Sequence, residues 1–145
     1  MNMPTSREQK LALRFAAAWN RLERQLDSSL GAIRGVSLAE YRLLRALADA
    51  PKAQASRVDL ASAVGLTPSG VTRALRPMEK LGVVSTLRSK RDARLAIAAL
   101  TPAGRELIND VSDVVDDTMR MILERSALVA KRLDEFVDLL DDLGR

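Results

Sequence analysis

Apolar residues recur at intervals of three and four along most of the chain, the spacing of one face of a helix. The pattern predicts helices over residues 7–30, 37–48, 57–64, 67–81, 101–125 and 127–143. Between them the period changes, and the short runs 83–87 and 94–100 read as two strands around the polar, basic stretch 88–93. We therefore expect a mainly α fold of the α+β class in one domain, residues 1–145.

The predicted helix starts carry hydroxyl residues, which cap free backbone N–H groups. Ser37 with Glu40 forms a capping-box pattern, in which the carboxylate reaches back to the start of the helix. Thr67 and Thr101 are each followed by proline, which suits the first helical position. Helix 67–81 is expected to bury Val71, Leu75, Met78 and Leu81, and helix 127–143 to turn Leu133, Phe136, Val137, Leu140 and Leu143 inward.

The two helices over residues 57–81 meet across a tight turn at Gly65. Counted from Arg57, Ala61 is fifth, Gly65 ninth and Val71 fifteenth. The small alanine lets the helices approach, the glycine permits a left-handed turn, and the valine locks the second helix onto the first. Followed by a basic hairpin, this pair indicates a winged helix-turn-helix. An ordinary αα-hairpin is the alternative, but it predicts neither the hairpin nor a hydroxyl-and-cation face on the second helix.

Composition limits the chemistry that the protein can perform. The 145 residues are 47% hydrophobic and include no cysteine and no histidine, so disulfides, thiolate nucleophiles, Cys/His zinc sites and an imidazole base are excluded. No catalytic motif accompanies the remaining carboxylates and hydroxyls, so we expect neither an enzyme nor a cofactor or metal. The N-terminus lacks the apolar stretch of a signal peptide, and we expect a cytoplasmic protein with no membrane partner.

Positive charge is concentrated in the middle of the chain. Residues 1–51 hold 8 Lys/Arg and 5 Asp/Glu, residues 52–100 hold 9 and 3, and residues 101–145 hold 6 and 11. The three segments therefore carry +3, +6 and −5 within a total of +4. A basic centre is typical of nucleic-acid binders, although a solvated charged face without a partner is the common alternative.

Residues 56–107 resemble the DNA-binding part of the MarR-type transcriptional regulators. The wing carries the D-x-R pattern of that family at Asp92-Ala93-Arg94, and the next helix begins with its T-x-x-G stretch at Thr101–Gly104. The resemblance implies a homodimer whose subunits each join a DNA-binding lobe, here residues 37–103, to a dimerisation base, here residues 1–35 and 104–145. It also implies a regulator, most often a repressor, that binds a pseudo-palindromic operator in double-stranded DNA.

The candidate DNA contacts lie on the second helix of the motif and in the wing. On the helix they are Thr67, Ser69, Gly70, Thr72, Arg73 and Arg76, and in the wing Arg88, Lys90, Arg91, Asp92 and Arg94. We expect Arg73 and Arg76 to contact bases or phosphates, with phosphate contact alone as the alternative for each. The resemblance implies that Asp92 holds Arg94 in position. The stretch "RSKRDAR" is compact, which predicts a wing of short reach.

The outer helices carry the dimer prediction, with Leu11, Phe15, Phe136, Leu140 and Leu143 as candidate interface residues. Burial of these stripes against each other within one chain is the alternative. Family members often release DNA when a small phenolic or aromatic ligand binds between lobe and base, and Arg14, Trp19 and Tyr41 are the candidates for such an effector. A protein–protein adaptor or anti-repressor that keeps the fold without binding DNA is the competing function.

Overall fold

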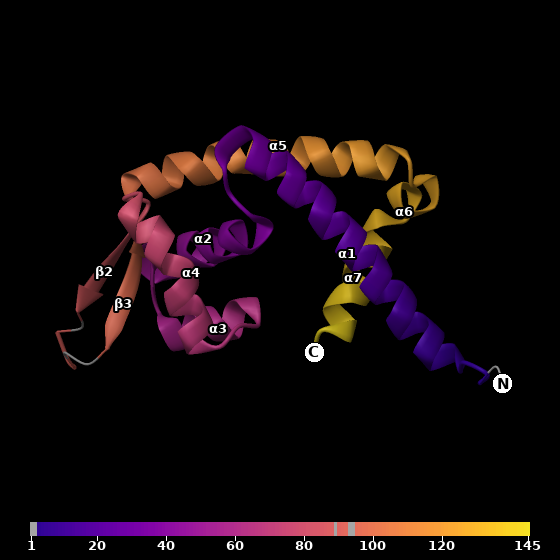
Figure 1. Cartoon of the computed structure of the whole chain (residues 1–145), viewed down its shortest axis with the longest axis horizontal. Coiled ribbons are helices and arrows are strands. Elements are labelled where there is room, and N and C mark those ends of the chain that lie inside the picture. Colours follow the sequence, from indigo (N-terminus) through magenta and orange to yellow (C-terminus); the bar gives the residue numbers. More distant parts are fainter. Residues whose placement is uncertain (1–2, 89, 93–94) are drawn as a thin grey trace.

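The computed structural model describes residues 3–88, 90–92 and 95–145. The described chain forms a lobe, built from α2 to β3, and a helical base, built from α1, α5, α6 and α7 (Figure 1). The helices are α1 (Arg7–Arg34), α2 (Leu38–Asp49), α3 (Arg57–Val64), α4 (Pro68–Lys80), α5 (Pro102–Glu124), α6 (Ala127–Lys131) and α7 (Leu133–Leu143), and a 3₁₀ turn spans Pro51–Ala53. The strands are β1 (Gln54–Ser56), β2 (Val84–Arg88) and β3 (Ala96–Leu100).

Local capping sets where the helices begin. At α1 the Ser6 hydroxyl accepts from the Gln9 N–H while the Gln9 side chain accepts from the Ser6 N–H, so both halves of a capping box are present. At α2 the Ser37 hydroxyl accepts from the Glu40 N–H, which confirms the predicted cap. The Glu40 carboxylate, however, accepts from the Ser37 hydroxyl, 3.1 Å away, and not from the Ser37 backbone as the capping-box pattern suggested.

The lobe contains a three-stranded antiparallel sheet in the order β1-β3-β2. The hairpin of β2 and β3 confirms the predicted pair of strands, with Val84 opposite Leu100 and Arg88 opposite Ala96. The sequence pattern did not predict β1, which pairs with β3 so that Gln54 lies opposite Ala99. A strand of three residues is too short to show an alternating pattern, so its place in the sheet comes from the partner strand.

The lobe core confirms the packing constraints of the helix-turn-helix. Ala61 and Val71 are buried between α3 and α4, and Gly65 ends α3 with a φ of 71°, in the left-handed region. Leu75 and Met78 continue the buried stripe of α4. The prediction for Leu81 is wrong, since its side chain is 75% exposed. Leu81 is the C-cap residue that follows the end of α4 at Lys80, and its side chain does not continue the buried face of Val71, Leu75 and Met78.

The base is held to the lobe by a second group of buried residues, where α1 crosses α5: Leu26, Leu30, Val36, Leu38 and Val111. The α1 helix extends past its predicted end at Leu30 to Arg34 and closes with Gly35 at a φ of 65°. Within the described residues, no helix is long and apolar enough to cross a membrane.

The C-terminal segment differs from the prediction of one helix over 127–143. It breaks at Arg132 into α6 and α7. The five residues of α7 predicted to face inward are all exposed, from 37% at Leu140 to 66% at Leu143. The reason is the path of the chain, because α7 turns away from α5 after the break and packs within the chain mainly on α6 (Figure 1).

Candidate nucleic-acid interface

The first turn of α4 is open to solvent and fixed by its own cap. The Thr67 hydroxyl accepts from the Gly70 N–H at 3.0 Å, and Pro68 occupies the first helical position. The Thr72 hydroxyl donates to the Pro68 carbonyl at 3.1 Å, so its hydrogen is used inside the helix and its oxygen can serve a further partner only as an acceptor. Ser69 is exposed between them. The structure therefore brings the predicted polar residues of this turn together at one end of α4.

Gly70 has a structural role that the sequence did not reveal. A Cβ at this position would lie 3.2 Å from the Thr67 hydroxyl oxygen, closer than ordinary contact. The absence of a side chain therefore leaves room for the cap of α4. The role of Gly70 as a DNA contact stays a prediction.

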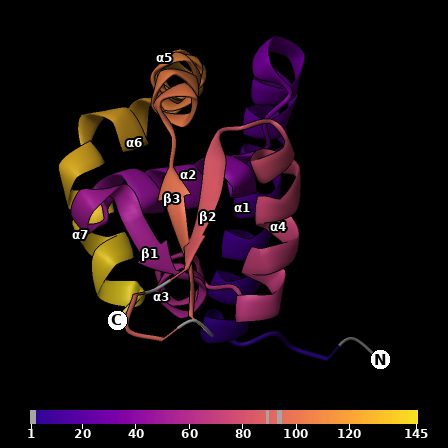
Figure 2. The same cartoon turned by 90° about the vertical axis from the view of Figure 1, so that its left-hand side faces the viewer.

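Arg73 and Arg76 lie on the exposed side of α4, opposite its buried residues Val71 and Leu75. Neither guanidinium has a hydrogen-bond or ion-pair partner within the part of the chain that the structure describes. In the view toward the lobe, α4 stands beside the sheet and the wing extends from the same side of the molecule (Figure 2). The lobe thus presents two uncommitted cations next to a basic hairpin.

The wing residues lie at the end of the β2–β3 hairpin. Arg88 closes β2, and Lys90 and Arg91 are exposed beyond it. Asp92 is half-buried, and its carbonyl accepts from the Leu95 N–H at 2.9 Å as the chain turns back toward β3. Arg94 lies outside the described residues, and so does its predicted contact with Asp92.

Arg57 is a basic residue of the lobe that is engaged within the protein. Arg57, the first residue of α3, places Nη2 3.2 Å from Oε1 of Glu79 on α4 and 3.3 Å from the hydroxyl of Thr86 on β2. The positive charge that the sequence assigned to residues 52–100 is thus partly neutralised inside the lobe. Sequence reasoning missed this contact because the partners lie 22 and 29 positions away, with no local pattern to link them.

The T-x-x-G stretch has a physical explanation at the junction of lobe and base. The Thr101 hydroxyl accepts from the Gly104 N–H at 3.1 Å and donates to the Gly82 carbonyl at 2.6 Å. The Thr101 N–H also bonds the Val83 carbonyl at 3.1 Å. One residue therefore caps α5 and attaches it to the turn that follows α4.

The three residues predicted to bind an effector are not brought together. Tyr41 lines a hollow of about 490 Å³ between α2 and α3, and its hydroxyl lies 2.9 Å from the Ser112 hydroxyl on α5. Arg14 and Trp19 are exposed on the N-terminal half of α1 and do not line this hollow. The structure thus places Tyr41 apart from Arg14 and Trp19, because α1 carries its N-terminal half away from the lobe (Figure 1), and which of the three would contact an effector stays a prediction.

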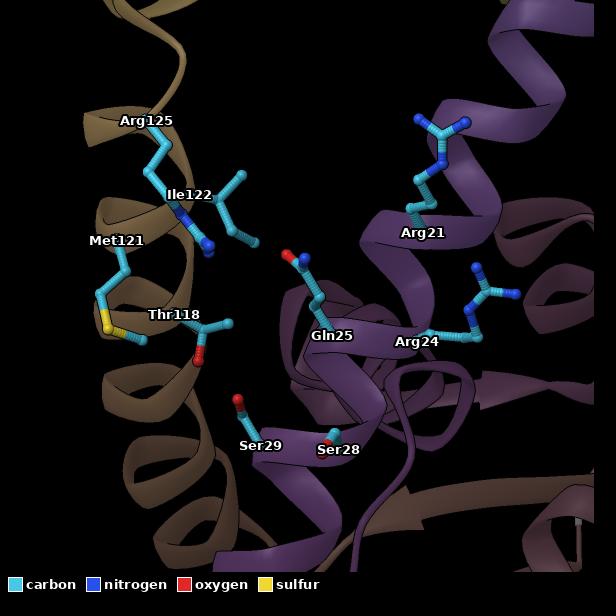
Figure 3. A pocket seen from close by; sticks show the side chains of 9 residues that line it. All are labelled: Arg21, Arg24, Gln25, Ser28, Ser29, Thr118, Met121, Ile122 and Arg125. Carbon is cyan, nitrogen blue, oxygen red and sulfur yellow. The ribbon is translucent and has the colours of Figure 1, made fainter.

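A different cleft, of about 450 Å³, opens between α1 and α5 (Figure 3). Gln25 and Ser29 of α1 and Thr118 of α5 face the space between the helices, and the Arg125 side chain lies across it. Arg21 and Arg24 extend from α1 away from α5 in the same view. The cleft is polar and open, and none of the predicted effector residues lines it.

The predicted dimer residues are exposed in the single chain. Leu11 and Phe15 on α1 are 62% and 45% exposed, and Phe136 and Leu140 on α7 are 41% and 37% exposed. The alternative that these stripes bury against each other within one chain is therefore wrong. Solvent exposure of several large apolar side chains on one element is typical of an interaction surface.

Comparison with known proteins agrees with this geometry. The model of the MarR family matches residues 34–95. The uncharacterized HTH-type transcriptional regulator YdgJ of Bacillus subtilis (strain 168) is 32% identical over 111 residues, which are 77% of this chain and 63% of that protein. The chain therefore spans less than two thirds of the length of this curated relative.

Two solved structures extend the likeness over nearly the whole chain. The MarR family regulator Sco3205 from Streptomyces coelicolor, determined in complex with DNA, shares 26% identity at a TM-score of 0.80, covering 97% of this chain and 91% of that one. NadR in complex with 4-hydroxyphenylacetate shares 25% identity at a TM-score of 0.76, covering 99% of both chains.

The fold and the exposed face of α4 thus define a winged helix-turn-helix protein with an added helical base. The MarR family combines this lobe with such a base, and its model matches the lobe of this chain. Residues 34–95 thus match the MarR family of transcriptional regulators, and the whole chain has the fold of the MarR family regulator Sco3205.

Proposed function

We propose that this protein is a sequence-specific regulator of transcription that binds double-stranded DNA as a homodimer, most simply as a repressor on a pseudo-palindromic operator. The observation that carries the proposal is the exposed face of α4, where Arg73 and Arg76 are uncommitted beside a basic wing. The DNA complex of the relative Sco3205 supports it.

The proposed binding mode follows from the shape of the lobe. A helix of this size fits the major groove with its N-terminal turn at the base edges, so Ser69, Thr72 and Arg73 are the candidates for base contact. An arginine can grip guanine O6 and N7 with both terminal nitrogens, while Ser and Thr hydroxyls suit phosphates or base edges. The wing cations would follow the phosphate backbone or enter the narrow minor groove beside it.

The homodimer is proposed from the unpartnered faces of the base. Leu11, Phe15 and Trp19 of α1 and the apolar residues of α7 need a cover that the single chain does not supply. Their charges favour the same arrangement, because α7 is acidic whereas the N-terminal half of α1 carries Arg7, Lys10 and Arg14. A second copy therefore offers each helix both an apolar and an oppositely charged partner, and it doubles the DNA contacts.

An effector is the second part of the proposal. The hollow beside Tyr41 lies between α2 and α3, and its rim includes Arg42 and Arg45. The Tyr41 hydroxyl and the Arg42 guanidinium suit a small aromatic acid, whereas Arg45 is already paired with Asp49 on the same rim. NadR is a relative solved with 4-hydroxyphenylacetate. Binding there would bear on α2 and α3, and through them on the placement of α4.

The test is binding to a labelled copy of the upstream DNA of the protein's own gene, against scrambled DNA, at two salt concentrations. We expect preference for the upstream DNA, weaker binding at higher salt, and loss of preference in Arg73→Ala. Arg120→Ala is the matched control, because it removes an exposed arginine from α5 in the base. If random-sequence selection with the wild-type protein also yields no preferred site, the regulator proposal fails and the adaptor function takes its place.

A further inference from the structure

Three side chains from three elements of the lobe meet beside the wing. Arg57 begins α3, Glu79 lies near the end of α4, and Thr86 is at the centre of β2. Arg57 Nη2 contacts both Oε1 of Glu79 and the Thr86 hydroxyl, and the Thr86 hydroxyl donates to the same Glu79 oxygen at 2.5 Å. Each residue therefore contacts the other two, and we refer to them as the α3–α4–β2 triad.

The triad is more enclosed than a surface ion pair. The side chains of Arg57 and Glu79 are 18% and 31% exposed, whereas those of Arg45 and Asp49, a pair within α2, are 47% and 67% exposed. Nη1 of Arg57 is buried and has no hydrogen-bond partner among the residues that the structure describes. A partly desolvated guanidinium depends on its remaining partners, so the geometry of the triad is held more firmly than that of an exposed pair.

The position of the triad along β2 is important because the strand leaves the core there. Val84 is buried, but Thr86, Leu87 and Arg88 are exposed. Beyond Val84, the hydrophobic core no longer fixes this strand to the helices. The contact of Thr86 with Glu79 and Arg57 therefore attaches the outer half of the wing to α4, the helix that carries Arg73 and Arg76.

We propose that the α3–α4–β2 triad is a positioning device that sets the wing relative to α4, so that operator recognition depends on three residues that do not contact DNA. The inference rests on the proposed DNA binding. Simultaneous contact by α4 in one groove and the wing in the next requires a fixed angle between them, and a supporting group that holds this angle contributes to affinity.

For one substitution, the proposal predicts a change in DNA affinity that is opposite to the change expected from electrostatic attraction alone. Glu79→Gln removes a negative charge from the DNA-binding lobe, which by attraction to phosphates alone would strengthen binding. If the triad positions the wing, the same substitution weakens binding, because the ion pair with Arg57 is lost. Asp49→Asn is the matched control, since it makes the same charge change in an exposed pair of the same lobe.

The experiment measures the operator affinity of wild type, Glu79→Gln, Thr86→Val and Asp49→Asn, together with thermal melting and hydroxyl-radical protection of the DNA. We expect Glu79→Gln and Thr86→Val to bind about three- to tenfold more weakly than wild type. Protection should fall mainly at the minor-groove flanks that the wing covers. Asp49→Asn should bind as tightly as wild type or slightly more tightly.

Two results would overturn the inference. The first is that Glu79→Gln binds the operator as tightly as Asp49→Asn. The second is that the affinity falls while the protection of the minor-groove flanks keeps its wild-type pattern; this result would indicate that the triad only stabilises the fold. Thr86→Val decides the matter if Glu79→Gln does not fold, because it changes no charge and little volume. If wild type prefers no DNA sequence at all, the proposed function and this inference fail together, whereas a normal wild type with unaffected variants removes only the inference.

Discussion

Gly104 on α5 lies so close to Val83 that a Cβ at residue 104 would be 2.2 Å from the Val83 carbonyl oxygen and 2.6 Å from Cδ1 of Leu100. The first turn of α5 thus packs directly against the backbone at Val83, the residue before β2. With the hydrogen bond from Thr101 to the Gly82 carbonyl, this contact fixes the base to the lobe at the end of α4. The T-x-x-G stretch is therefore a packing device as well as a helix start.

Gly104→Ala should destabilise the protein by about 2–4 kcal/mol, because the new methyl group meets a backbone oxygen that cannot move aside without shifting the turn. Urea unfolding followed by circular dichroism measures it. Gly31→Ala in α1 is the control: nothing lies within 4 Å of its Cβ position, so it should gain about 0.5–1 kcal/mol from helix propensity. Equal effects at the two glycines would contradict the packing explanation.

Thr101→Val should cost about 1–3 kcal/mol, since the substitution removes both the cap of α5 and the hydrogen bond to the Gly82 carbonyl while keeping the side-chain shape. Thr101→Ser keeps the hydroxyl and should recover most of the loss. Unfolding curves of the three proteins give the comparison. Serine as destabilising as valine would show that the threonine methyl group, and not the hydroxyl, holds the junction.

Arg73 and Arg76 should contact different parts of the DNA. Arg73, nearer the first turn of α4, is expected to contact a base, so Arg73→Ala should cost about 1–3 kcal/mol on the operator and relax specificity at one base pair. Arg76→Ala should weaken binding to all sequences alike and lower the salt slope by about one, as loss of a phosphate contact does. Titrations over a salt series, on the operator and its single base-pair variants, separate the two. The reverse assignment would mean that α4 enters the groove at a different depth.

Leu140→Asp should convert the proposed homodimer to a monomer, because it places a charge in the apolar face of α7. Sedimentation equilibrium measures the association, and operator binding should fall with it. Val58→Asp is the control, since Val58 is an exposed apolar residue of α3 in the lobe. A Leu140→Asp protein that still sediments as a dimer would place the interface elsewhere.

Much of the lobe was predictable because its determinants are local. Ala61, Gly65 and Val71 act within one pair of consecutive helices, and the caps at Ser56, Thr67 and Thr101 lie three positions from the N–H groups they accept. The helical spacing of apolar residues in α4 predicted its buried face and, by the same spacing, its exposed face. Of the candidates predicted on that face, Ser69, Arg73 and Arg76 are exposed, and the Thr67 and Thr72 hydroxyls already form hydrogen bonds at the start of the helix.

The sequence by itself determined the helix-turn-helix, the hairpin and the order of the helices, because each depends on spacing within a few residues. Only the tertiary structure decided what lies far apart in the chain: β1 as the third strand, the pairing of Arg57 with Glu79 and Thr86, and the exposure of α7. It also placed Tyr41 at a hollow that neither Arg14 nor Trp19 lines. Periodicity shows which face of a helix is apolar; the path of the whole chain determines what that face meets.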